Sequence, residues 1–370
     1  MSRRLLEIES LADFDTHIGR ARRLNGWFVS SLDLTDRSPA LLAADPAGAV
    51  FLGCHFSPEV EDRLRTAGAL LFPRLPDLPF DPYRPGLYDA AQLYGTGPVR
   101  SSPDALIYTW ARSAAAAALS GALATTLHDH AISDALDDTT ASLDPRKVVG
   151  LMGGHALRRT DPAYAAAARL GSALTAGGCT VLTGGGPGAM EAGNLGAYLS
   201  PWPDAVDEAL AMVGAAPGYQ PDLDAWVASA YAVRDRWPGT EAGTSLSIPT
   251  WFYGHEPSNL FATRIAKYFA NALREDTLLH RCRGGIVYLP GQAGTVQEIF
   301  QAVTENFYAA DPSEIAPMVL VGVDYWTERL PAWPLLQRLA ADRPMAAAIH
   351  CVEDIDEATD LLVSATAAGS

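Results

Sequence analysis

The chain has 370 residues, which is more than one usual domain and enough to bury a large core. Its formal net charge of −16 argues against a nucleic-acid partner or an acidic membrane surface, because both favour clustered Lys and Arg. The four cysteines lie far apart with no paired spacing, so the sequence indicates neither a zinc site nor a disulfide framework.

The first region, residues 1–140, is predicted to be an N-terminal α/β accessory region. Apolar runs predict strands at residues 48–53 and 69–72, with a helix at residues 59–67 between them. An alanine-rich pattern then predicts one long helix over residues 104–129. The N-terminus lacks the apolar run of a signal peptide, and no uncharged stretch is long enough to span a bilayer, so we expect a cytoplasmic protein.

The end of the long helix carries residue types that can bind metals. They are His128, Asp129, His130, Asp134, Asp137 and Asp138. The two histidines lie two positions apart and face different directions on a helix, so a polar, solvated helix end is the better interpretation and no metal is expected. The polar stretch at residues 137–146, which contains Pro145, marks the predicted domain boundary.

From residue 146 to residue 370, short apolar strands alternate with longer helices. The expected strands are residues 147–152, 179–183, 284–289, 317–323 and 349–352, with an extended segment at 244–251. The expected helices are residues 161–176, a helix up to 199, 204–212, 223–236, 260–281 and 296–307. This alternation predicts a doubly wound, mainly parallel sheet of the Rossmann-like α/β class, covered by helices on both faces.

Three turns that contain glycine follow three of these strands, and in such a sheet they meet at the carboxyl edge, where ligands bind. They are Gly-Gly-His at residues 153–155, Gly-Gly-Gly-Pro-Gly-Ala-Met at 184–190 and Pro-Gly-Gln-Ala-Gly-Thr-Val-Gln-Glu at 290–298. Glycine turns and free helix N-terminal amides favour an anion, which predicts a phosphate site. Thr295 and Glu298 also fit a capping box, in which they would only satisfy their own helix. The convergence of three turns favours phosphate binding.

Two common phosphate-binding motifs are not matched. The turn that begins at Gly184 has Ala189 at the position of the third glycine of a dinucleotide fingerprint, and Pro187 interrupts it. No Gly-Lys-Ser/Thr follows any of the turns, which argues against a triphosphate P-loop. Neither NAD nor a nucleoside triphosphate is therefore expected.

Residues 290–298 resemble the Pro-Gly-Gly-x-Gly-Thr-x-x-Glu signature of the LOG (Lonely Guy) family, which includes cytokinin-activating phosphoribohydrolases and bacterial nucleotide 5′-monophosphate nucleosidases. The resemblance extends to the turns at residues 153–155 and 184–190 and covers roughly residues 146–325. The longer bacterial nucleosidases match better than the short plant-type enzymes. The resemblance implies a homo-oligomer in which the first region has a regulatory or interface role.

The family's catalytic pair is the last glutamate of the signature and an arginine on the preceding helix. Glu298 matches the glutamate, and Arg274 stands at nearly the family spacing. Arg264, one helical segment earlier, is the competing candidate. Either arginine could instead be an exposed cation or form an ion pair with Glu275 or Asp276.

Gln292 stands where the family has its second glycine. If that position requires a positive φ, glutamine is strained there, and if glycine allows a close approach, glutamine crowds the phosphate. The predicted substrate- and phosphate-binding residues are Gly153, Gly154, His155, Gly184, Gly185, Gly186, Gly188, Met190, Gly291, Gly294 and Thr295.

The resemblance implies hydrolysis of the N-glycosidic bond of a nucleoside 5′-monophosphate to free base and ribose 5-phosphate. Glu298 would stabilise an oxocarbenium-like state and orient or deprotonate water, with no metal or cofactor. The alternative is a non-catalytic nucleotide sensor or carrier of the same fold. A pyridoxal phosphate decarboxylase would need a Schiff-base lysine, and with only Lys147 and Lys267 available this activity is disfavoured.

Overall fold

The structure is a computed structural model that describes residues 5–253 and 256–368, with side chains up to residue 363. The chain divides into two compact units. One comprises Met1–Leu87 and Thr109–Asp137, and the other comprises Tyr88–Tyr108 and Asp138–Ser370. None of the helices in the described ranges is long and apolar enough to cross a membrane.

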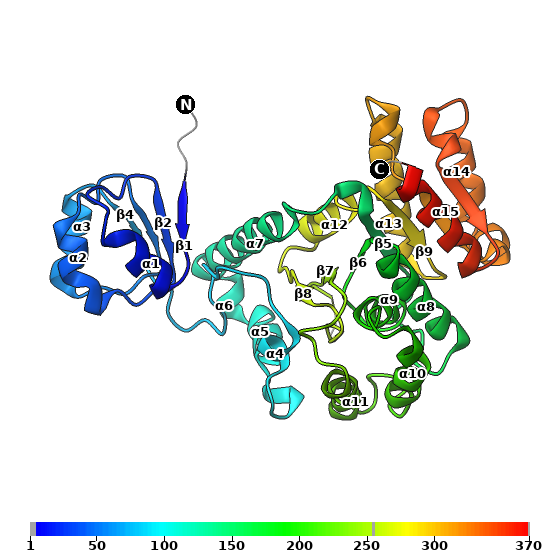
Figure 1. The fold of residues 1–370 in the computed structure, drawn as a ribbon, viewed down its shortest axis with the longest axis horizontal. Helices are drawn as coiled ribbons and strands as arrows, with labels where there is room; N and C mark the ends of the chain where they lie inside the picture. The colour runs from blue at the N-terminus through cyan, green and yellow to red at the C-terminus, as the bar shows by residue number, and fades with distance from the viewer. Residues whose placement is uncertain (1–4, 254–255, 369–370) are drawn as a thin grey trace. The chain divides into compact units, whose positions relative to one another are not determined.

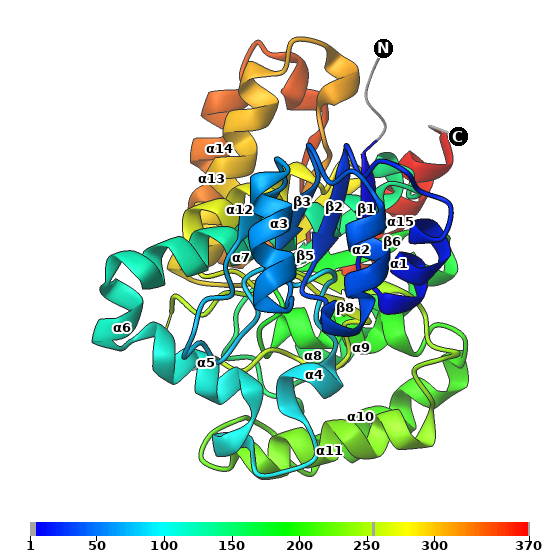
Figure 2. The same cartoon turned by 90° about the vertical axis from the view of Figure 1, so that its left-hand side faces the viewer.

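The N-terminal unit is built on a four-stranded parallel sheet in the order β1-β2-β3-β4 (Figure 1). Three helices alternate with the strands along the chain and lie beside the sheet (Figure 2). Phe14, Leu41 and Leu64, one from each helix, contribute to the buried core. The elements are β1 (Leu6–Ile8), α1 (Leu11–Ile18), β2 (Trp27–Ser30), α2 (Ser38–Ala43), β3 (Val50–Leu52), α3 (Pro58–Thr66) and β4 (Leu70–Phe72). The two strands and the helix predicted in this part of the chain are confirmed as β3, β4 and α3.

The single long helix predicted over residues 104–129 is wrong. The stretch holds α5 (Pro103–Ala111), α6 (Ala114–Ala117) and the first half of α7 (Leu119–Thr140), after a short α4 (Ala90–Tyr94). Ser113 interrupts the helix because its hydroxyl accepts a hydrogen bond from the Ala116 amide and caps α6. Gly121 allows α6 to pass close to α7, since a Cβ there would lie 2.2 Å from the Ala115 carbonyl oxygen.

The polar, solvated helix end predicted from six residues is only partly correct. Four of the side chains are exposed as expected, those of His130, Asp134, Asp137 and Asp138. The prediction is wrong for His128 and Asp129, which are buried, and α7 continues past them to Thr140. His128 Nδ1 lies 3.2 Å from Asp129 Oδ1. The rings of Phe80 and His128 pack edge to face, with their centroids 5.3 Å apart. Burial lowers the pKa of His128. The two polar side chains are buried as a pair, which hydrophobic periodicity alone does not predict.

The larger unit contains a seven-stranded sheet in the order β11-β10-β9-β5-β6-β7-β8, with every neighbouring pair parallel. This confirms the predicted parallel α/β fold of the Rossmann-like type. The strands are β5 (Val148–Met152), β6 (Thr180–Thr183), β7 (Ser245–Ser247), β8 (Arg264–Ile265), β9 (Gly285–Tyr288), β10 (Met318–Val321) and β11 (Ile349–Val352). Every residue of β5, β9 and β10 is buried, as expected when helices cover both faces of a sheet.

The helices of this unit form two layers. On one face α8 packs against α9 and α15, and on the other α13 packs between α12 and α14 (Figure 1). The bounds are α8 (Pro162–Ala176), α9 (Ala189–Tyr198), α10 (Val206–Gly214), α11 (Leu223–Arg236), α12 (Asn271–His280), α13 (Ala293–Tyr308), α14 (Ala332–Ala340) and α15 (Ile355–Ala368).

The helix predicted over residues 260–281 is wrong in its first half, which forms β8 and irregular structure, and only α12 is helical. The backbone of this half bonds to its neighbours instead of to itself. The amides of Thr263 and Ala266 donate to carbonyls of β7, and the Ile265 amide donates to the Tyr88 carbonyl. The apolar residues from Leu260 to Tyr268 are all buried, so this stretch lacks the clear division into a buried and an exposed face that an amphipathic helix shows.

The strand order places a switch point between β5 and β9. From β5 the chain adds β6, β7 and β8 in one direction, and from β9 it adds β10 and β11 in the other. The loops that leave two strands at such a point diverge to opposite faces and leave a crevice at the carboxyl edge, where ligands bind in α/β proteins. The turns at residues 153–155 and 290–292 leave these two strands.

Candidate active site

A cavity of about 470 Å³ opens at this switch point. Its volume lies within the usual range for small-molecule sites. It brings together Gly153, Gly154, His155, Met190, Arg274, Gly294, Thr295 and Glu298 from the predicted site residues, and adds Ala156, Tyr253, Glu256, Glu275, Gln292, Ala293 and Gln297.

The three predicted turns are bonded to one another at the floor of this cavity. The Leu289 amide donates to the Met152 carbonyl, and the Gly154 amide to the Pro290 carbonyl at 3.2 Å. The Gly154 carbonyl in turn accepts from the Ala189 amide, also at 3.2 Å. These bonds connect the segments that follow β5 and β9 to each other and to the start of α9.

Helix α13 begins at the cavity with free amides. Its N-cap residue is Gln292, which makes no side-chain capping bond, and Thr295 is the third residue of the helix. The capping box considered from the sequence is therefore wrong. The amides of Ala293, Gly294 and Thr295 have no acceptor within the helix, and all three residues line the cavity. They form an anion-binding position of the kind found at helix N-termini.

Gln292 is not strained in place of the family glycine. Its φ is −113°, outside the left-handed region that favours glycine, and its side chain is exposed. Gly294 faces open space, because a Cβ there would have no neighbour within 4 Å. Gly291 is buried beneath the turn, where a Cβ would lie 2.1 Å from Thr295 Oγ1. Close packing against Thr295 therefore requires glycine at position 291.

Arg274 is buried on α12 with its guanidinium held on three sides. Its Nε donates to the Ile248 carbonyl at 2.6 Å, its Nη2 to the Gly184 carbonyl at 3.1 Å, and its Nη1 to the Glu275 carboxylate. The guanidinium also requires glycine at position 184, because a Cβ there would lie 2.4 Å from Nη2. Arg264, the competing candidate, is exposed on β8 and is not among the residues that line the cavity.

Glu298 is 7% exposed and lies one turn into α13, facing the cavity. Burial raises the pKa of its carboxyl group to about 8. The Arg274 guanidinium lowers this pKa, and the negative charge of Glu275 raises it further. At neutral pH the carboxyl group therefore carries a proton in the ligand-free protein. In this state the carboxyl group can donate a proton, and it can accept one from water only after it has ionised.

Glu275 is a cavity residue that the sequence analysis considered only as an ion-pair partner of the arginine. It forms that ion pair with Arg274, is 4% exposed and lines the cavity. Its Oε2 is buried with no hydrogen-bond partner among the described residues. A carboxylate next to a candidate arginine was visible in the sequence, but its burial was not.

The remaining predicted residues support the cavity from behind or at its mouth. Gly185 and Gly188 have φ of +78° and +74°, which only glycine adopts without strain, and Gly188 is the N-cap residue of α9. Gly186 packs on Met190, since a Cβ there would lie 2.8 Å from the Met190 Cε. His155 is half-exposed, with Nδ1 3.5 Å from Glu256 Oε1. Gly184, Gly185, Gly186, Gly188 and Gly291 are not among the cavity-lining residues.

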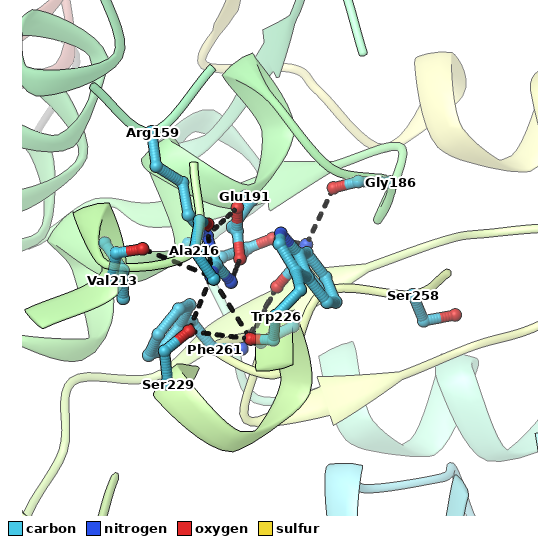
Figure 3. A network of polar contacts seen from close by, with 12 residues as sticks. Arg159, Gly186, Glu191, Val213, Ala216, Trp226, Ser229, Ser258 and Phe261 are labelled. Atoms are coloured by element: carbon cyan, nitrogen blue, oxygen red, sulfur yellow. Dashed lines mark hydrogen bonds and ion pairs between the residues drawn. The ribbon is translucent and has the colours of Figure 1, made fainter. Parts of the chain in front are cut away.

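A buried polar network behind the turns holds α9 in place (Figure 3). Glu191, in the first turn of α9, accepts two hydrogen bonds from Arg159, and Arg159 also donates to the carbonyls of Ala216 and Trp226. On the other side of the network Asn259 Nδ2 donates to the Gly186 carbonyl and to Asn194 Oδ1. The turn at residues 184–188 is therefore fixed from both ends.

Lys267 lies outside this cavity in a buried ion pair. Its Nζ is 2.6 Å from Asp104 Oδ1 and 2.9 Å from Ser258 Oγ, and the side chain is 2% exposed. Lys267 therefore lies away from the candidate cavity and serves as the ion-pair partner of Asp104.

The N-terminal unit has a larger cavity, of about 710 Å³, at the carboxyl ends of β2, β3 and β4. Its ionisable lining residues are His55, Arg74, Asp77 and Asp81. All four are exposed and of both signs, so this lining does not single out one ligand chemistry. The smaller cavity, with its buried Arg274, Glu275 and Glu298, is the better candidate for chemistry.

No protein-family model and no curated protein matches this chain. Solved structures do match. The molybdenum cofactor carrier protein MCP from Chlamydomonas reinhardtii is 16% identical over 60% of this chain and 98% of its own, with a TM-score of 0.37. The protein TM1055 is 18% identical over 59% of this chain and 99% of its own, with a TM-score of 0.36. The molybdenum cofactor binding protein from Rippkaea orientalis is 16% identical over 59% and 95%, with a TM-score of 0.35. Identities and scores this low transfer no function to this chain.

Proposed function

We propose that this protein hydrolyses the N-glycosidic bond of a nucleoside 5′-monophosphate, releasing the free base and ribose 5-phosphate. The observation that carries the proposal is the meeting of Glu298 and Arg274, from two different helices, in one cavity beside the free N-terminus of α13. The motif resemblance described above supports the same reaction.

In this proposal the 5′-phosphate occupies the start of α13. The free amides of Ala293, Gly294 and Thr295 and the helix dipole stabilise its charge, and the open space at Gly294 leaves room for its oxygens. The phosphate is remote from the bond that breaks, so its binding energy serves to position the ribose. The fixed Arg274 guanidinium provides donors for the ribose or phosphate oxygens.

Glu298 acts as the proton donor to the leaving base, because its carboxyl group holds a proton below a pH of about 8. The bond between C1′ and the base nitrogen breaks with its electron pair on the nitrogen, which takes the Glu298 proton. Water adds to C1′ of the oxocarbenium-like sugar, and its proton returns to the Glu298 carboxylate. The carboxylate formed in the middle of this sequence also stabilises the positive sugar.

The test is to incubate the pure protein with AMP, GMP, CMP, UMP and IMP and to separate free base by chromatography. We expect release of base from at least one nucleotide. Glu298→Gln should abolish release while nucleotide still binds, and Glu305→Gln, on the same helix outside the cavity, should behave as the wild type. Binding of nucleotide to the wild type without any base release would identify the alternative, a non-catalytic nucleotide carrier or sensor.

A further inference from the structure

Glu275 is buried in a way that should cost stability, and a purely structural role does not explain that cost. One carboxylate oxygen receives a hydrogen bond from Arg274, while Oε2 is buried with no partner in the described part of the chain. A buried carboxylate oxygen without a partner destabilises a protein. An amide or hydroxyl side chain could accept one bond from Arg274 without burying a full charge.

The groups around Glu298 show what that charge does. Two charged groups on α12, Arg274 and Glu275, act on Glu298 directly. The other ionisable groups nearby are the hydroxyl of Tyr288, the thiol of Cys282, and the side chains of His155 and Glu256 at the cavity wall. Burial raises the pKa of Tyr288 and of Cys282, so both stay uncharged. The positive charge of Arg274 stabilises the ionised form of Glu298, and the negative charge of Glu275 destabilises it.

We propose that Glu275 is a positioning residue for the glycosidic reaction, fixing the Arg274 guanidinium at the cavity wall and offsetting its charge so that Glu298 keeps a proton for the leaving base. This inference rests on the proposed function. Without Glu275, the same guanidinium would face Glu298 as an unpaired cation, and the two would form a new ion pair. Glu298 would then be ionised and unable to donate.

The test compares Glu275→Gln with Asp276→Asn, which removes a charge one position further along α12 from an exposed side chain. The rate of base release is measured from pH 5 to pH 9. For the wild type and for Asp276→Asn we expect a fall in kcat/KM centred near the pKa of Glu298, at about pH 8. For Glu275→Gln the midpoint should move down by about one pH unit or more. A uniform loss at every pH, with the midpoint unchanged, would mean that Glu275 is only structural and would overturn the inference.

A second measurement separates failure of this inference from failure of the proposed function. The titration of Glu298 is read without catalysis from the pH dependence of unfolding free energy, with Glu298→Gln as reference in both the wild-type and the Glu275→Gln backgrounds. A lower midpoint in the Glu275→Gln background supports the coupling even if no nucleotide is cleaved, in which case the proposed reaction alone is wrong. An equal midpoint in both backgrounds overturns the inference whatever the activity.

Discussion

Gly184→Ala is expected to disable the site by moving one side chain. The added Cβ would lie 2.4 Å from Arg274 Nη2 and 2.9 Å from Met190 Sδ, whereas ordinary contacts begin at 3.4 Å. The guanidinium must therefore retreat by about 1 Å and give up its bond to the Gly184 carbonyl. A hydrogen bond from a charged donor contributes about 1.5–3 kcal/mol, and a 1 Å misplacement at a site can cost roughly 100-fold in rate. We expect kcat/KM to fall about 30- to 300-fold.

The Gly184→Ala variant should remain folded, because the atoms that must move are the ends of two side chains, those of Arg274 and Met190. We expect the free energy of unfolding to fall by roughly 1–3 kcal/mol, measured by urea denaturation. Gly97→Ala is a matched control in the same unit, since a Cβ there meets nothing within 4 Å. Wild-type kcat/KM in Gly184→Ala would show that the placement of Arg274 does not matter for the reaction.

Three further predictions concern the ionisable groups. Because folding raises the pKa of Glu298 from 4.5 to about 8, the folded state binds a proton that the unfolded state has lost, and stability falls as pH rises between these values. Glu298→Gln should remove this slope, so its unfolding free energy relative to the wild type should rise by roughly 3–5 kcal/mol between pH 4 and pH 9; parallel curves would contradict the burial argument. Arg274→Ala should lose at least as much kcat/KM as Arg264→Ala, and the reverse order would identify Arg264 as the active arginine. Arg159→Ala should cost about 3–5 kcal/mol in urea denaturation by leaving Glu191 buried and unpaired, whereas Arg236→Ala, at an exposed pair with Glu208, should cost under about 1 kcal/mol; similar losses would show that burial of the first pair is unimportant.

The parallel sheet was predictable because its signal is local and repeated. Runs such as residues 147–152 and 284–289 are short, apolar and separated by helices, and each appears in the structure as a strand within a residue or two. The site turns followed from the same pattern, since turns after parallel strands share one edge. Arg274 and Glu298 were named from the motif resemblance, and their shared cavity is a finding of the structure.

The features that the sequence analysis missed depend on tertiary contacts. Residues 260–270 carry apolar residues at helical spacing, but the backbone here bonds to β7, and the apolar side chains from Leu260 to Tyr268 are buried. The break at Ser113 depends on a hydroxyl that caps a one-turn helix, and the burial of His128 depends on Phe80, 48 positions earlier. The proton on Glu298 depends on its burial and on the balance of two neighbouring charges, which no spacing rule reports.

The three anchors of Arg274 link assembly of the protein to readiness of its site. The side chain starts on one helix layer and ends on carbonyl oxygens that lie just beyond β6 and β7, so those strands and α12 must all be in register before the guanidinium finds its acceptors. An arginine stays ionised throughout, and a misfolded chain would have to bury that charge unmatched. Molecules that reach the native state should therefore already have the Arg274 guanidinium in its position at the cavity. The fraction of folded molecules with a misassembled site should be small.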